Sequence, residues 1–190
     1  AVINKPCGLL SVPAYGGKEK SAQGILESLM RKNGSYSAQH RPFAVHRLDR
    51  DTSGVLLFAL DEAAQHKIMD SWHTMVKGRL YRAVSENPRR NPLPERGTID
   101  APLELNAYRQ GYVPEQGGSI FARTHFTVLE RGAVYTLFEL ELDTGRKNQI
   151  RAHLASRGYP IAGDTDRRAR TNPFGRLALH ARTLRFVHPY

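Results

Sequence analysis

The stretch between Phe121 and Leu142 most constrains what this chain can fold into. It contains two strand-like runs separated by Arg131-Gly132, and in the second run, Tyr135–Leu142, apolar and polar residues alternate. Because successive side chains of a strand point to opposite faces, the alternation gives one buried and one solvated face. We therefore predict an antiparallel hairpin. The buried face would carry Thr136, Phe138, Leu140 and Leu142.

Three helices are predicted beside the strands. Ser21 is placed to cap a helix that ends at Asn33-Gly34. Asp61 is placed to cap a second, whose apolar residues recur at helical spacing as far as Met75 and which ends at Lys77-Gly78. The third covers residues 149–157. Separate strands joined by hairpins, with a few helices, predict an α+β fold on a mainly antiparallel central sheet.

The chain is strongly basic, with a formal net charge of +10 and a pI near 10.0. A surface of this charge attracts polyanions, and nucleic acid is the first candidate. An anionic membrane is a weaker candidate because the arginines are spread along the chain rather than gathered on one helix. A basic protein without a polyanionic partner remains the alternative.

Length, cysteine content and motifs exclude several classes of protein. At 190 residues, the chain is predicted to form one domain, residues 1–190. Its one cysteine, Cys7, excludes an internal disulfide and a cysteine-rich zinc site. The motifs of zinc proteases, P-loops and dinucleotide sites are absent, so no metal or cofactor is expected. The sequence has no candidate membrane span and no signal-peptide pattern, so we expect a cytoplasmic protein. The chain begins and ends within strand-like runs, so we expect that both ends are trimmed.

The segment His46–Gly54 has the features of a functional loop. It places Asp49 between Arg47 and Arg50, which makes poor core material, and the apolar run Val55–Leu60 follows directly. The loop is therefore expected at the mouth of a buried strand.

A second candidate group of charges lies at the start of the third helix. Arg146, Lys147 and Arg151 oppose the helix dipole there, so they are expected to serve an anion. A carboxylate that acts as nucleophile or base must stay ionised, although burial raises its pKa, and it therefore needs a neighbouring cation. Arg151 is the natural donor to Asp49.

One aromatic residue completes the candidate site. In the predicted strand Arg79–Val84, Leu80 and Val84 are expected to pack inward, which leaves Tyr81 to face a groove. If the substrate is a base within structured RNA, the base must leave its stack, and the protein must offer an aromatic face and phosphate contacts in return. Tyr81 and the arginines meet both needs.

These residues stand within longer motifs, which resemble those of the RluA-type RNA pseudouridine synthases. The motifs occur in order along nearly the whole chain. They are Asn4-Lys5-Pro6-x-Gly8-Leu9, His46-Arg47-Leu48-Asp49-x-x-Thr52-Ser53-Gly54, Leu80-Tyr81-x-Ala83, Thr144-Gly145-Arg146-x-x-Gln149-Ile150-Arg151-x-His153-Leu154, Gly163-Asp164, Leu179-His180-Ala181 and His188-Pro189.

The resemblance implies the pseudouridine synthase fold, with a catalytic cleft across the central sheet. It implies cofactor-independent isomerisation of uridine in structured RNA, ribosomal or transfer RNA, by a protein that we expect to be a monomer. Asp49 matches the essential aspartate, Arg151 its ion-pair partner and Tyr81 the residue that stacks on the target base. Further predicted RNA contacts are Arg47, beside the flipped nucleotide, with His46, Arg50, Arg146, Lys147 and Arg168.

Alternatives remain at each of these residues. Asp49 can be a turn residue that caps the loop, Tyr81 an ordinary sheet aromatic, Arg146 a loop anchor and His46 a partner of the backbone. If Asp49 is catalytic, it either attacks C1′ or removes the 2′ proton.

Two other functions also remain open. One is an RNA-binding or RNA-folding protein whose chemistry is idle. The other is a base-excising hydrolase, which would need a second carboxylate such as Asp51 or Asp143. The sequence departs from the commonest family pattern at Lys147-Asn148, Arg79 and Arg168-Ala169. These departures leave the identity of the substrate RNA open. No S4-like RNA-binding module is expected in this chain.

Overall fold

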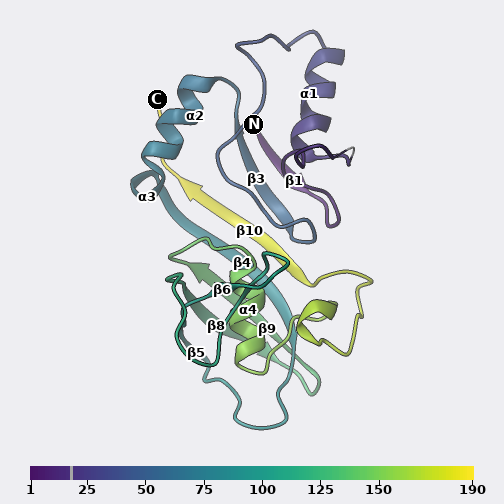
Figure 1. Cartoon of the computed structure of the whole chain (residues 1–190), viewed down its shortest axis with the longest axis vertical. Coiled ribbons are helices and arrows are strands. Elements are labelled where there is room, and N and C mark those ends of the chain that lie inside the picture. The colour runs from purple at the N-terminus through teal and green to yellow at the C-terminus, as the bar shows by residue number, and fades with distance from the viewer. Residues whose placement is uncertain (18) are drawn as a thin grey trace. The chain divides into compact units, whose positions relative to one another are not determined.

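A computed structural model describes residues 1–17 and 19–190 and divides them into two compact units. The first unit comprises Ala1–Gly78 and Ala181–Tyr190, and the second comprises Arg79–His180. Strands β4 (Val76–Glu86) and β10 (Leu179–Phe186) contain the points where the chain passes from one unit to the other (Figure 1). That residues 1–190 act as a single domain stays a prediction.

The first unit is built around strand β3, which pairs antiparallel with β1 and with the short β2. In the first pairing Val2 lies opposite Leu57 and Lys5 opposite Gly54. Its elements are β1 (Val2–Lys5), α1 (Ala22–Lys32), β2 (Phe43–Ala44), β3 (Ser53–Ala59), α2 (Glu62–Asp70) and α3 (Trp72–Met75).

The predicted helix caps of this unit are confirmed. The side chain of Ser21 accepts a hydrogen bond from Gly24 N, and that of Asp61 accepts one from Ala64 N. Each cap satisfies an amide that has no partner within the helix. The buried residues of α2, Ala64 and Ile68, then pack against strands β2 and β3.

The predicted extent of the second helix was wrong. It breaks at Ser71 into α2 and α3, and strand β4 begins at Val76, before the glycine that we expected to end the helix. Gly78 instead lies in the strand, where a Cβ atom would stand 2.9 Å from Nε of Arg185. The glycine therefore makes room for a neighbouring side chain within the sheet.

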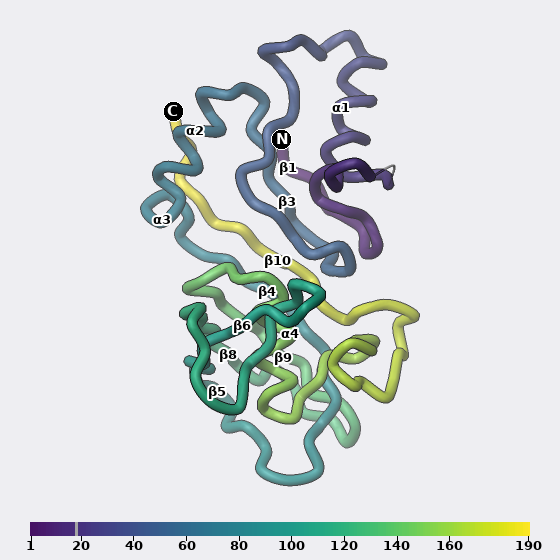
Figure 2. The backbone as a smooth tube through the Cα atoms, in the orientation of Figure 1, coloured from purple at the N-terminus to yellow at the C-terminus, as the bar shows by residue number. Residues whose placement is uncertain are grey.

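The second unit contains the strand order β4-β9-β8-β5, with antiparallel pairing throughout. The predicted hairpin is confirmed as β8 and β9, with a β-bulge between Val128 and Glu130. Figure 2 shows the loop of residues 87–95 extending away from the strands that it connects. The elements are β5 (Arg96–Asp100), β6 (Glu104–Leu105), β7 (Gly111–Tyr112), β8 (Arg123–Arg131), β9 (Tyr135–Leu142), α4 (Gln149–Ser156) and the 3-10 helix η1 (Thr165–Arg167).

The core of this unit lies between α4 and the inner faces of the strands. Phe138 and Leu140 are fully buried, as the alternation in β9 predicts, and Ile150 and Leu154 of α4 pack into the same cluster. Helix α4 is therefore fixed on the sheet by its apolar face. The predicted α+β class with mainly antiparallel pairing is confirmed.

The prediction for β4 is confirmed for Val84 and was incomplete for the face that carries Tyr81. Ala83 is only 1% exposed, and Tyr81, on the same face, is half-buried against the core cluster. Val84, on the opposite face, also packs against that cluster. Alternation alone does not distinguish the faces of a strand that is covered on both sides.

Candidate functional site

The loop that carries Asp49 is held by the buried side chain of Ser11, which binds the backbone of Leu48. The Ser11 hydroxyl donates to Leu48 O at 2.7 Å and accepts from Leu48 N at 3.0 Å, and both residues are buried. Asp49 itself is half-buried, and its carbonyl accepts from Thr52 N at 3.1 Å. The backbone of Asp49 is thus fixed on both sides while its side chain is not fully enclosed.

A buried lysine fastens the other end of this loop. The ammonium of Lys5 donates to Pro6 O, Leu9 O and Arg50 O at 2.9, 2.7 and 2.8 Å, and the residue is fully buried. Burial lowers the pKa of Lys5, while the nearby charges of Cys7, Asp51 and Asp49 raise it. Three carbonyl acceptors satisfy all three ammonium protons.

Two further residues set the course of the chain around the loop. Nε2 of His46 accepts from Leu57 N at 3.0 Å, so this side chain binds the backbone of β3. Gly54 has φ 120°, and a Cβ atom there would lie 2.1 Å from Ala181 O. Only glycine fits this close approach of two backbones.

The arginines flanking Asp49 are both exposed, and Arg50 forms an ion pair with Glu19. In the second unit, Arg146, Lys147 and Arg168 are exposed as well. Nε of Arg146 donates to Phe121 O at 3.0 Å. Arg146 was expected either to contact RNA or to anchor the loop, and this hydrogen bond is an anchoring contact.

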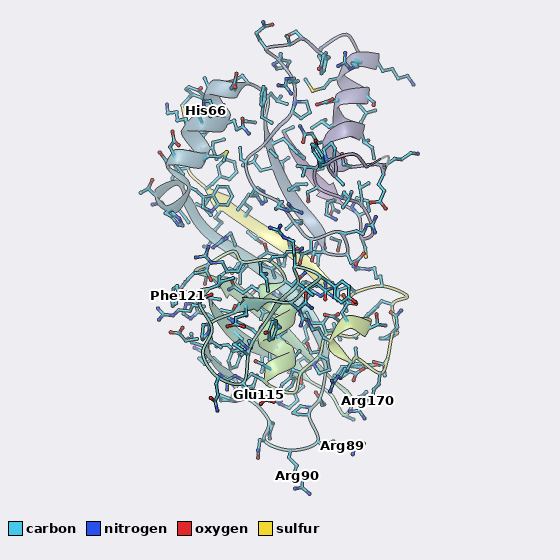
Figure 3. All side chains as sticks on the ribbon, viewed as in Figure 1. His66, Arg89, Arg90, Glu115, Phe121 and Arg170 are labelled. Atoms are coloured by element: carbon cyan, nitrogen blue, oxygen red, sulfur yellow. The ribbon has the colours of Figure 1, made fainter. Side chains whose placement is uncertain are left out.

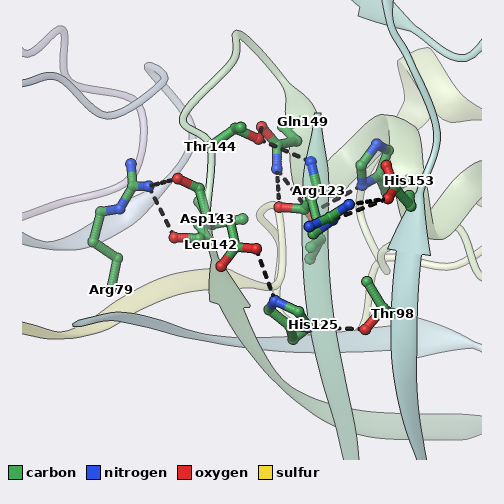
Figure 4. Close-up of polar contacts among 11 residues, drawn as sticks. Arg79, Thr98, Arg123, His125, Leu142, Asp143, Thr144, Gln149 and His153 are labelled. Atoms are coloured by element: carbon green, nitrogen blue, oxygen red, sulfur yellow. Dashed lines mark hydrogen bonds and ion pairs between the residues drawn. The ribbon is translucent and has the colours of Figure 1, made fainter. Parts of the chain in front are cut away.

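The turn before α4 is fixed by the side chain of Gln149, which is buried (Figure 4). Its Oε1 accepts from Thr144 Oγ1 at 2.8 Å and from Arg146 N at 3.0 Å. Its Nε2 donates to Arg123 O and to Thr124 Oγ1, both at 2.9 Å. A fully satisfied buried amide of this kind holds the start of α4 in one position on strand β8.

His153 extends this network one turn further along α4 (Figure 4). Its Nε2 lies 2.9 Å from Ala101 O, an acceptor, and its Nδ1 lies 2.9 Å from Thr124 Oγ1. The contact with the carbonyl requires a proton on Nε2, which leaves Nδ1 to accept from the hydroxyl. Burial lowers the pKa of His153 and outweighs the hydrogen bond to Ala101 O, which raises it, while the charge of Arg157 lowers it further, so the imidazole stays neutral.

Arg79 fastens the same turn from strand β4 (Figure 4). Its Nη2 donates to Leu142 O at 2.8 Å and to Asp143 O at 3.0 Å. A Cβ atom on Gly145 would lie 2.6 Å from Nη1 of Arg79, so the glycine makes room for the guanidinium. This departure from the commonest family pattern therefore has a structural role.

Arg151 is held by two carboxylates. Its Nε and Nη2 donate to the two oxygens of Asp164 at 2.7 and 2.6 Å, and Nη2 also donates to Asp166 at 2.9 Å. The side chain of Asp164 is fully buried and that of Arg151 is 10% exposed, whereas Asp166 is 47% exposed. Asp164 therefore fixes the orientation of the guanidinium through a bidentate contact.

The predicted catalytic residues lie in different units, with Asp49 in the first and Tyr81 and Arg151 in the second. The ion pair between Asp49 and Arg151 and the catalytic roles of all three residues stay predictions. The sequence interpretation gave no roles to Lys5, Ser11 and Asp164. Lys5 and Asp164 stood within recognised motifs, and only a fold can show that they are buried.

Two classes of site find no support among the described residues. In residues 1–17 and 19–190, no three His, Cys, Asp or Glu side chains are grouped so as to hold a metal ion. Within the same residues, no helix has the length and apolar character needed to cross a membrane.

Comparison with known proteins identifies the family of the chain. A family model described as RNA pseudouridylate synthase matches residues 1–156. The chain belongs to this family. The match includes the Asp49 loop, Tyr81 and Arg151, and the resemblance inferred from the motifs is confirmed.

Curated relatives and solved structures agree with this assignment. An RNA pseudouridine synthase of Chloroflexus aurantiacus is 38% identical over 98% of this chain and 58% of its own length. A ribosomal large subunit pseudouridine synthase D of Xylella fastidiosa is 34% identical over 99% of this chain and 59% of its own. The chain thus spans about three fifths of the length of these relatives.

The likeness extends to a solved structure. The human RNA pseudouridylate synthase domain containing 4 matches with a TM-score of 0.73 and 25% identity, over 96% of this chain and 79% of the human one. The predicted pseudouridine synthase fold is confirmed.

Proposed function

We propose that this chain is the catalytic part of an enzyme that isomerises specific uridines in structured RNA to pseudouridine. The observation that carries the proposal is the family match over residues 1–156, together with a candidate aspartate on a rigidly held loop. The name of the Xylella fastidiosa relative favours ribosomal RNA over transfer RNA as the substrate. We place this activity in the cytoplasm.

The proposed reaction breaks the bond between uracil N1 and C1′ and joins C1′ to C5; the hydrogen on C5 then leaves to solvent as a proton, and N1 takes up a proton. Asp49 acts either as the nucleophile, whose bond to C1′ breaks when C5 bonds to C1′, or as the base that removes the 2′ proton and later returns it, and both routes need the carboxylate ionised. Arg151 supplies the compensating charge. Its orientation by Asp164 and Asp166 supports this role, because a guanidinium fixed beforehand needs no reorganisation during the reaction.

The target base must leave its stack, which costs a few kcal/mol. Tyr81 would stack on the extruded base, and Arg47 would contact the RNA beside the flipped nucleotide. The exposed Arg50, Arg146, Lys147 and Arg168 would contact phosphates. His46 already binds the backbone of Leu57, which supports a structural part in shaping the loop.

The reaction can be followed by labelling the uridines of RNA with tritium at C5, because forming the new bond releases that hydrogen to water. Large-subunit ribosomal RNA and a transfer RNA mixture are tested separately with the full chain. Asp49→Asn is expected to lower the rate of tritium release by about a hundredfold or more while RNA affinity is retained. The matched control is Asp51→Asn, which removes a neighbouring carboxylate of the same loop.

Normal tritium release by Asp49→Asn contradicts the assigned role of this residue. Binding of both RNAs by the wild type without any tritium release contradicts the enzymatic proposal and favours the idle RNA-binding protein. Release of free uracil favours the hydrolase.

A further inference from the structure

The β6–β7 hairpin of the second unit presents an aromatic side chain to solvent. Tyr108 lies in the turn of this hairpin and is 83% exposed, and the exposed Arg109 follows it directly. An aromatic ring of this size is normally at least half-covered by its own protein. Within residues 1–17 and 19–190, no ion pair or hydrogen bond engages the side chain of either residue.

The turn is nevertheless fixed in one conformation. Oδ1 of Asn106 accepts from Tyr108 N at 3.0 Å and from Gln110 N at 2.9 Å, while Arg109 N donates to Asn106 O at 2.8 Å. Arg109 adopts the left-handed conformation with φ 56°, which is unfavourable for an arginine by roughly 1 kcal/mol. The exposed pair is therefore presented by a well-defined backbone.

The base of the hairpin is fastened close to Arg151. Gln110 Nε2 donates to Asp166 at 3.2 Å, and Asp166 accepts from Arg151. Arg167 donates to Gly111 O, and a Cβ atom on Gly111 would lie 2.2 Å from Lys147 O. The hairpin thus packs against the segment that leads into α4.

A second exposed aromatic residue lies beside the same segment. Phe121, labelled in Figure 3, is 53% exposed. Its carbonyl accepts from Arg146, and the guanidinium of Arg123 lies 5.3 Å from the centre of its ring. Segment 120–121 is joined to the residue before β6 by the bridge between Leu103 and Ile120. The segments that carry Tyr108 and Phe121 both contact the turn that leads into α4.

Exposed aromatic rings beside unpaired guanidinium and ammonium groups suit unpaired nucleotides, because bases stack on the rings and phosphates bind the cations. We propose that Tyr108 and Arg109 dock unpaired nucleotides of the substrate RNA other than the target uridine, with Phe121, Arg146 and Lys147 continuing this surface. The inference rests on the proposed function and adds a determinant of RNA choice. A double-stranded helix offers no free base faces and would use only the cations.

The test measures RNA affinity, which does not depend on turnover. Two fluorescein-labelled RNAs are compared by fluorescence anisotropy, a stem with a uridine-containing single-stranded loop and a fully paired duplex of the same stem sequence. Tyr108→Ala is expected to weaken binding of the looped RNA by about tenfold and that of the duplex by much less. Tyr108→Phe keeps the ring and is expected to retain affinity within about twofold.

Arg109→Ala is expected to reduce the slope of log Kd against log salt concentration by about 0.7 for the looped RNA. Tyr190→Ala is the matched aromatic control, since Tyr190 is 74% exposed but belongs to the first unit. Arg90→Ala is the matched cationic control, from the loop between β4 and β5 (Figure 3). Circular dichroism checks that each variant is folded.

The inference is overturned if Tyr108→Ala binds the looped RNA as the wild type does, or if Tyr190→Ala loses as much affinity. An equal loss on the loop and the duplex also overturns the stacking assignment. Failure of the proposed function has a different signature. In that case the wild type binds RNA without releasing tritium, whereas the loss of affinity in Tyr108→Ala can still be measured.

Discussion

Replacing Asp164 by asparagine is expected to lower the free energy of unfolding by about 3 kcal/mol. The carboxylate is fully buried and accepts from Nε and Nη2 of Arg151 at 2.7 and 2.6 Å. Asparagine keeps the shape but turns an amide toward the guanidinium, so a buried cation loses its bidentate partner. Breaking a buried pair from one side costs about 3–5 kcal/mol, and the lower end applies because Asp166 still binds Arg151.

The matched control is Asp166→Asn, which makes the same change of charge on a side chain that is 47% exposed. Its cost is expected to stay below about 1 kcal/mol. For a chain of this length, the two values correspond to falls in Tm of about 6–12 °C and of less than about 4 °C. Urea unfolding followed by circular dichroism measures both. Equal losses in the two variants would refute the assignment of Asp164 as the buried anchor of Arg151.

Two further predictions concern buried cationic or neutral groups. Lys5→Met removes the donor to three carbonyls and is expected to lower the free energy of unfolding by about 2 kcal/mol, measured by urea unfolding. A neutral result would mean that relief of the buried charge offsets the lost hydrogen bonds. Because the pKa of His153 is lowered in the folded protein, its contribution to stability is complete above about pH 6.5 and is lost as the pH falls below that value. Unfolding at pH 7.5 and 5.5 is expected to show a smaller pH dependence in His153→Gln than in the wild type, and identical slopes would contradict this.

The elements that sequence predicted well are those in which a local pattern decides the structure. Alternation in Tyr135–Leu142 identified both the strand and its buried face, because this face packs on α4 and the opposite one is more exposed. Ser21 and Asp61 identified helix starts because a cap binds amides only three residues away. Strand β4 lacked such a signal, since residues on both of its faces contact the core.

The candidate site was predicted less completely, because its supporting contacts join residues distant in sequence. Lys5 reaches Arg50 O, 45 residues further along the chain, and a motif alone does not show that the lysine is buried. The link between Arg151 and Asp164 spans 13 residues across the end of α4. Charge composition pointed to RNA without showing which cations are buried. Only the fold separates Arg151, held by carboxylates, from the exposed Arg146 and Lys147.

The two carboxylates on Arg151 have different surroundings, and this difference separates stability from RNA docking. The side chain of Asp164 is fully buried, so its charge stabilises the guanidinium of Arg151 and, through it, the fold. Asp166 is half exposed and shared, because it accepts from Arg151 and also from Gln110 at the base of the β6–β7 hairpin. Removal of both carboxylate oxygens, as in Asp166→Ala, should therefore cost little stability while loosening the hairpin that presents Tyr108. Affinity for the looped RNA would fall in Asp166→Ala, whereas Asp164→Asn, at a temperature where it is folded, would retain it.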